Sequence, residues 1–113
     1  MGLFKKRRTH PHEELIERQL AIFAEDNARL GQELEDALAA YRRATKLDAE
    51  DSFGDVQDVA EQGRDELERI RESFATTLTE ELADEYRIEF DRRAAQRYPE
   101  FALELDVWAR EDD

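Results

Sequence analysis

The chain of 113 residues is long enough for one domain, and it carries a formal net charge of −13. Hydrophobic residues make up 40% of it and charged residues 42%. That composition suits thin helical layers, in which each helix buries one stripe, better than a thick globular core. With only four Gly and two Pro, the chain also has too few turn formers for a β fold. We therefore expect an all-α protein.

Several classes of protein are excluded by what the composition lacks. Cysteine is absent, which rules out disulfides, thiolate metal sites and cysteine nucleophiles. No apolar run approaches the roughly 20 residues that span a bilayer. The basic start of the chain is not followed by the apolar region of a signal peptide. These features are compatible with a cytoplasmic protein, which is the location that we expect.

Residues 1–11 are expected to form a basic, flexible tail. The tail contains Lys5, Lys6, Arg7 and Arg8 and no acid. Removing these four charges from the total of −13 leaves −17 on the rest of the chain, which repels nucleic acid and anionic membranes. Only residues 1–8 could therefore bind either, and weakly, since each base contributes about 1 kcal/mol near an anionic surface. The tail could equally contact the acidic body of a neighbouring molecule, or have no role.

A long first helix is predicted from about residue 12 to 46, directly after Pro11. Within it, residues at alternating steps of four and three form the seam of a coiled coil. The seam consists of Ile16, Leu20, Phe23, Asn27, Leu30, Leu34, Ala37, Tyr41 and Ala44. At about 1.5 Å per residue the helix is roughly 50 Å long. It needs a partner of similar length to cover the seam.

A second helix is predicted from about 55 to 77, because turn formers between Asp48 and Gly54 interrupt the pattern and a new stripe then starts at Val56. An antiparallel αα-hairpin is the simplest arrangement of the two stripes. It would bring together Tyr41 and Ala60, Leu38 and Gly63, Leu34 and Leu67, and Phe23 and Leu78.

Further helices are predicted to complete a single helical domain over residues 12–108. A cluster of threonines predicts a kink or restart, and Thr77 with Glu80 fits a capping box. A third helix should then run to Pro99. Residues 100–108 should form a short last helix that folds back over a second face of the first helix, marked by Leu15 and Ile22. Residues 109–113 form an acidic C-terminal end.

No catalytic, cofactor-binding or metal-binding residues are predicted. His10 and His12 are the only histidines, and their spacing along an exposed segment would chelate a metal only weakly. Neither histidine has a Glu three residues before it, as a diiron helix bundle requires. There is no Gly-rich phosphate loop. We therefore expect a protein that is not an enzyme.

Asn27 on the seam leaves two arrangements open. A buried Asn at a seam position fixes register in parallel dimers, which would make Ile16, Leu20, Phe23, Asn27, Leu30 and Leu34 a self-association surface. The other arrangement is a hairpin within one chain, with Asn27 at its edge near Phe74. The register match between the two stripes favours the hairpin.

The predicted hairpin tip is the most unusual stretch of the sequence. Between Lys46 and Arg64 it holds the acids Asp48, Glu50, Asp51, Asp55, Asp58 and Glu61, and no base. Phe53 lies among them. One interpretation is a partner-binding tip formed by Asp48, Asp51, Phe53, Asp55 and Asp58, with the aromatic ring as its anchor. The alternatives are a solvated turn, or a ring that plugs the hairpin end.

A helical hairpin with an acidic tip resembles the prong of bacterial proteins that enter the secondary channel of RNA polymerase. In this chain Asp48, Asp51, Asp55 and Asp58 would be the tip acids. Those proteins usually carry a second globular or zinc domain, which does not show in this sequence, so the resemblance is one of architecture. The hairpin is also similar to small secreted proteins with a Trp-x-Gly turn, but Ser52-Phe53-Gly54 has no Trp at the matching position.

Three functions follow from these features. The heptads favour an adaptor or scaffold that acts by protein–protein contact, with self-association as one form of it. The tip charge favours a regulator that inserts an acidic prong into an enzyme such as RNA polymerase. The tail favours a peripheral membrane or nucleic-acid binder. We prefer the first, with an unknown protein partner.

Overall fold

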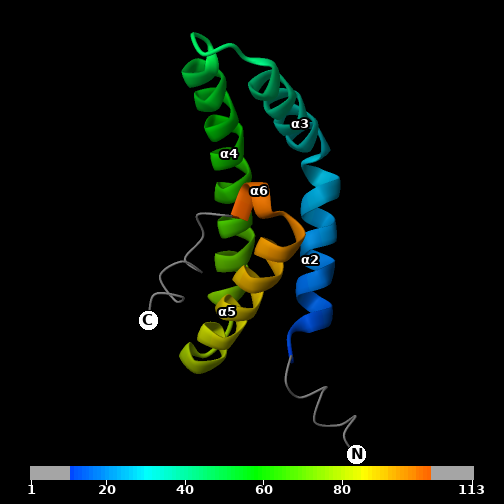
Figure 1. Ribbon diagram of the computed structural model, residues 1–113. Helices are drawn as coiled ribbons and strands as arrows, with labels where there is room; N and C mark the ends of the chain where they lie inside the picture. Colours follow the sequence, from blue (N-terminus) through cyan, green and yellow to red (C-terminus); the bar gives the residue numbers. More distant parts are fainter. Residues whose placement is uncertain (1–10, 103–113) are drawn as a thin grey trace, which may run out of the picture.

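The computed structural model describes residues 11–102, and within that range the fold is all-α. Helices cover 86% of it and it contains no strand, which confirms the predicted fold class. The helices are α2 (Glu13–Asp26), α3 (Ala28–Arg43), α4 (Ala49–Ala75), α5 (Glu80–Arg97) and α6 (Pro99–Ala102). They form an elongated body of 57 × 33 × 29 Å (Figure 1).

The first predicted helix is in fact two helices, because the backbone breaks at Asn27. Its dihedral angles are φ −120° and ψ 31°, outside the helical range. The Asn27 side-chain amide donates a hydrogen bond of 2.9 Å to the carbonyl oxygen of Phe23. Asparagine competes in this way with helical hydrogen bonding. The prediction of one uninterrupted helix from 12 to 46 is therefore wrong, and α3 ends at Arg43.

The turn between α3 and α4 comes earlier than predicted, at residues 44–48, where the Asp48 amide bonds to the carbonyl of Thr45. Helix α4 therefore starts at Ala49 instead of residue 55 and contains Gly54. One glycine costs a helix interior about 1 kcal/mol, which a helix of 27 residues tolerates. Acidic Glu50 and Asp51 in the first turn add favourable interactions with the helix dipole.

The early turn changes the register of the hairpin. The ring of Tyr41 packs against that of Phe53, with 5.6 Å between centroids. Phe53 lies seven residues, about two helical turns, before the predicted partner Ala60. The side chain that covers Gly63 belongs to Phe101. The predicted pairs Tyr41–Ala60 and Leu38–Gly63 are therefore wrong.

The helix stops and restarts at residues 76–79, as predicted, and the chain also reverses there, which the sequence did not predict. The hydroxyl of Thr79 accepts a hydrogen bond of 3.4 Å from the Leu82 amide and so caps α5. The predicted cap, Thr77, instead donates its hydroxyl to the carbonyl of Phe74. Helix α5 then runs back between α2 and α4 (Figure 1). The lower half of the molecule is thus a three-helix layer, while α3 and α4 alone form the upper arm.

The core lies where α2, α4 and α5 meet, with α6 at its upper edge. Its buried apolar residues are Ile16, Leu20, Phe23, Leu34, Leu67, Ala75, Ala83, Tyr86, Phe90, Ala94 and Phe101. The Tyr86 hydroxyl donates to the side-chain oxygen of Gln19 at 2.8 Å. The Phe23 ring contacts the rings of Tyr98 and Phe101, so the predicted approach of Phe23 to Leu78 is not the contact that covers it.

Ion pairs join α5 to both neighbouring helices. On the α4 side, Nη1 of Arg71 donates to Oδ1 of Asp91 at 2.8 Å, and both side chains are buried. Beside it, Arg87 bonds to Glu72 at 2.9 Å and lowers the pKa of that carboxyl. These bonds satisfy charges that would otherwise be costly to bury.

On the α2 side, Arg93 and Arg97 of α5 reach the carboxylate of Glu17. Arg93 also bonds to Glu89 on its own helix at 2.6 Å, and this hydrogen bond raises the pKa of the guanidinium. Helix α5 is therefore held by charge on both sides as well as by its apolar residues.

The last described helix, α6, does not follow the predicted path. Phe101 packs against Phe23 on the seam and against Gly63 of α4. Ile22, on the face that was predicted to be covered, stays 48% exposed. The predicted fold-back is therefore wrong as far as residue 102. The rest of that segment, including Trp108, lies outside the described residues, as do the basic tail and His10.

Candidate protein-docking site

The α3–α4 arm carries exposed apolar side chains at its tip. Leu47, in the connecting loop, is 91% exposed, while Phe53 and Tyr41 are 46% and 40% exposed. The two rings stack on each other at 47°, so Phe53 is held in place without being enclosed. No side chain between residues 35 and 62 is fully buried. The arm is thus a thin structure with apolar surface that the described chain leaves uncovered.

A groove of about 380 Å³ continues from this tip along α4 to α6. Its lining consists of Phe53, Val56, Gln57, Asp58, Ala60, Glu61, Arg64, Glu100 and Phe101. Phe53 and Arg64 are eleven residues apart on one helix, or about 16 Å. The groove is therefore long enough for a short segment of another chain.

The groove combines an apolar floor with acidic side chains. Phe53, Val56 and Ala60 follow at steps of three and four and so share one face of α4, and Phe101 closes the lower end. The lining contains three acidic residues, which are Asp58, Glu61 and Glu100, and one basic residue, Arg64. The guanidinium of Arg64 is 3.7 Å from the carboxylate of Glu61. The lining as a whole carries negative charge.

The predicted tip residues do not form one surface. Asp48, Asp51, Asp55 and Asp58 are all exposed and follow at steps of three, four and three, so they share a face of α4. At 100° per residue Asp48, Asp51 and Asp55 point away from the face that carries Phe53, whereas Asp58 also borders the groove. Only Asp58 and Phe53 also line the groove. The structure thus separates an acidic face from an apolar face on the same helix.

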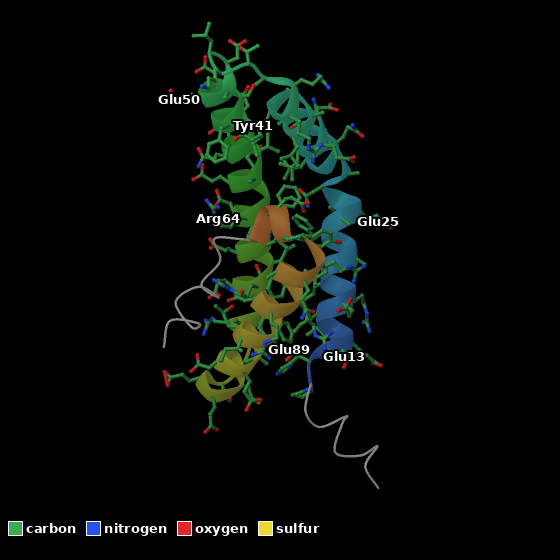
Figure 2. The ribbon with its side chains drawn as sticks, in the orientation of Figure 1. Glu13, Glu25, Tyr41, Glu50, Arg64 and Glu89 are labelled. Atoms are coloured by element: carbon green, nitrogen blue, oxygen red, sulfur yellow. The ribbon has the colours of Figure 1, made fainter. Side chains whose placement is uncertain are left out.

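Part of the acidic charge at the tip has a structural explanation. Arg42 and Arg43 lie in the last turn of α3, while Glu50 and Asp51 lie in the first turn of α4. The helix dipole favours basic residues at the C-terminal end of α3 and acidic residues at the N-terminal end of α4. Figure 2 shows Glu50 at the tip end of α4 and Arg64 farther down the same helix. The helix dipole does not explain the acidic residues beside the groove, which lie farther along α4 and in α6.

The predicted self-association seam is used within the chain. Ile16, Leu20, Phe23 and Leu34 are buried, and Leu30 is partly buried. The hydroxyl of Tyr98 donates to the carbonyl of Leu20 at 2.9 Å, and the Asn27 amide is bonded to Phe23. A homodimer through this stripe would have to displace α5 and α6.

Among residues 11–102 there is no group of three or more His, Asp or Glu side chains that could hold a metal ion. His12 packs edge-on against the Tyr86 ring, with centroids 5.6 Å apart. The carboxylates that lie between α5 and its neighbours are bound by arginines, as described above. Their arrangement stabilises the fold.

None of the helices in residues 11–102 is long and apolar enough to cross a membrane. Comparison of the chain with protein-family models, with curated proteins and with solved structures found no match.

The sequence pattern identified Phe53 but not the groove beside it. Val56 and Ala60 were visible as the start of a stripe that was assigned to the hairpin interface, whereas Phe53 was assigned to the tip. The contribution of Glu100 and Phe101 depends on α6 folding onto α4. No local pattern reports such a contact between distant parts of the chain.

Proposed function

We propose that the protein is a non-enzymatic protein–protein interaction module that binds an apolar, basic segment of a partner in the groove on α4. The observation that carries the proposal is the groove on α4, in which Phe53 is 46% exposed and shares an apolar floor with Val56 and Ala60. Exposed apolar patches rimmed by polar residues are typical of interaction sites.

The chemistry of the groove indicates which partners it fits. An aromatic ring held at the centre of a docking surface provides most of the binding energy in many interfaces, and Phe53 has this position between the tip and the groove. The acids Asp58, Glu61 and Glu100 would attract a basic segment and speed its approach. Lysine or arginine can also stack on an exposed aromatic ring.

The proposal can be tested with a photo-crosslinking amino acid at Gln57, which lines the groove and is exposed. The matched control carries the same amino acid at Glu25, which projects from α2 on the opposite side of the molecule (Figure 2). In the native cells, position 57 should give a specific adduct that position 25 does not. Equal adducts from both positions, or none from position 57, would contradict the proposal.

The opposite face of α4 supports a second candidate, a regulator that inserts the arm into an enzyme such as RNA polymerase. Asp48, Asp51, Asp55 and Asp58 line that face near the tip of the projecting arm, all exposed. This regulator would lose its effect when Asp51 and Asp55 are changed to Asn and keep it when Phe53 is changed to Ser. The groove proposal predicts the reverse order of effects.

A further inference from the structure

We propose that the segment that binds in the groove is residues 3–8 of a second copy of this chain, so that copies associate head to tail. The inference rests on the proposed function and names its partner. Residues 3–8 read Leu-Phe-Lys-Lys-Arg-Arg, two apolar side chains followed by four bases. This is the composition that an apolar floor with acidic rims would bind.

The length of residues 3–8 matches the length of the groove, just as their charges match its acidic lining. Six extended residues span at most about 20 Å, and the groove follows α4 for about 16 Å between Phe53 and Arg64. Leu3 and Phe4 would contact the floor formed by Phe53, Val56 and Ala60. The bases would then lie beside the acids that line the groove.

Several other acids of the body are less available to the tail. Glu13, Glu17, Glu72, Glu89 and Asp91 are each bonded to an arginine of α4 or α5. By contrast, neither Asp58 nor Glu100 forms an ion pair within the described chain. A basic segment therefore gains more beside Asp58 and Glu100 than beside those paired acids, because it does not have to displace an existing ion pair there.

The tail of the same molecule cannot make this contact. Arg8 is four residues from His12 and Phe4 is eight, which limits their reach to about 14 and 28 Å. The tip is at the far end of α2 and α3 from His12 (Figure 1), and those two helices together rise about 45 Å. The lower end of the groove is within reach of the tail, because Phe101 contacts Phe23, about 16 Å along α2 from His12. The upper end is not, so Phe4 cannot lie against Phe53. Only a second copy can place Phe4 there.

The contact is heterologous, since one copy contributes its tail and the other its groove. Each bound copy still has a free tail or a free groove, so assembly can continue into chains. Because the contact depends on exposed charges, added salt should weaken it. A parallel dimer through the seam would instead stop at two copies.

The test is sedimentation of the full chain and of three variants at low and high salt. The tail variant has Lys5, Lys6, Arg7 and Arg8 changed to Glu. The groove variant combines Phe53→Ser with Glu61→Lys, at exposed positions away from the core. The matched control, Glu25→Lys with Glu35→Lys, changes exposed acids on α2 and α3 that lie outside the groove lining.

The wild type and the control should increase in mass with concentration at low salt, and high salt should return them to the 13.3 kDa monomer. The tail and groove variants should each be monomeric, with unchanged circular dichroism. Mixed together, they should form a dimer and nothing larger, because only one intact tail and one intact groove meet. A monomeric wild type at all concentrations, or a mixture that stays monomeric, would overturn the inference.

Photo-crosslinking at position 57 separates this inference from the proposed function. In the purified chain the adduct should join position 57 to residues 3–8 of another copy. If pure protein gives no such adduct while native cells give one with a different basic protein, the self-association fails and the docking function stands. If neither gives an adduct, both fail.

Discussion

The ring of Phe101 lies directly on the backbone of Gly63, where α6 closes against α4. A Cβ atom built on Gly63 would be 2.1 Å from Cδ1 of Phe101 and 2.6 Å from two further ring atoms. Such distances are shorter than any real contact, so the ring occupies space that only glycine leaves free. The same ring contacts Phe23 of α2 and forms the lower end of the groove.

Gly63→Ala should therefore destabilise the fold, although alanine is the better helix former. We expect a loss of about 1–3 kcal/mol, the usual cost of overpacking, measured by urea unfolding. Gly31→Ala is the control, since a Cβ there meets nothing within 4 Å, and it should be neutral or stabilise by up to about 1 kcal/mol. Adding Phe101→Leu to Gly63→Ala should recover part of the loss. Strictly additive effects would contradict the contact.

The buried pair between Arg71 and Asp91 gives a second prediction. Asp91 is 0% exposed, and both of its carboxylate oxygens accept a hydrogen bond from Nη1 of Arg71. Asp91→Ala should cost about 3 kcal/mol because it leaves a buried guanidinium without that carboxylate. Glu33→Ala, which removes the exposed partner of Arg29, should cost less than about 1 kcal/mol. Equal costs in urea unfolding would show that α5 is not held by this pair.

Alkaline pH should destabilise the fold through Tyr86. Burial raises the pKa of its hydroxyl from 10 to about 12, so the folded chain keeps a proton that the unfolded chain loses. This stability is complete below pH 10 and falls as the pH rises towards 12, by about 3 kcal/mol in all. Tyr86→Phe should remove this fall, whereas Tyr41→Phe, at an exposed ring, should keep it. Unfolding measured at pH 9 and 11 distinguishes the two variants.

Salt and mild acid should stabilise the protein, because a net charge of −13 repels itself at neutral pH. Stability should stop rising near pH 5 and then fall. Hydrogen bonding to Arg87 lowers the folded-state pKa of Glu72 below 4.5, so its contribution is present above that pH and lost as the pH falls through the lowered value. A melting temperature that drops steadily up to about 0.5 M salt would contradict the repulsion.

Local signals in the sequence identified much of the secondary structure. The threonine cluster marked the interruption before α5, and Pro99 marked its end. The heptad pattern correctly identified the stripe with Ile16, Leu20 and Phe23, which is buried. It could not say what covers that stripe, because periodicity reports which face is apolar and not which element packs on it.

Two errors followed from that limit. The first error was to pair the stripe with α4 alone, whereas α5 and α6 also pack on it. The second was to treat the charged residues of α5 as solvent-exposed, although α5 lies between two other helices. Glu89 and Asp91 look solvent-exposed in sequence, but both are buried and bonded. The break at Asn27 was visible only as a polar residue on the seam, and its local hydrogen bond decides the outcome.

The central claim is that the tip and groove serve docking and not folding, and Phe53→Ser tests it most directly. The measurement is the yield of the position-57 adduct from Phe53→Ser, with urea unfolding of the same purified protein. We expect the adduct to be lost while the free energy of unfolding falls by less than about 1.5 kcal/mol, the range of one aromatic pair. Phe23→Ala, in the core, should cost about 3–5 kcal/mol. A stable Phe53→Ser variant with undiminished adduct would contradict the account, as would a loss of stability that matches Phe23→Ala.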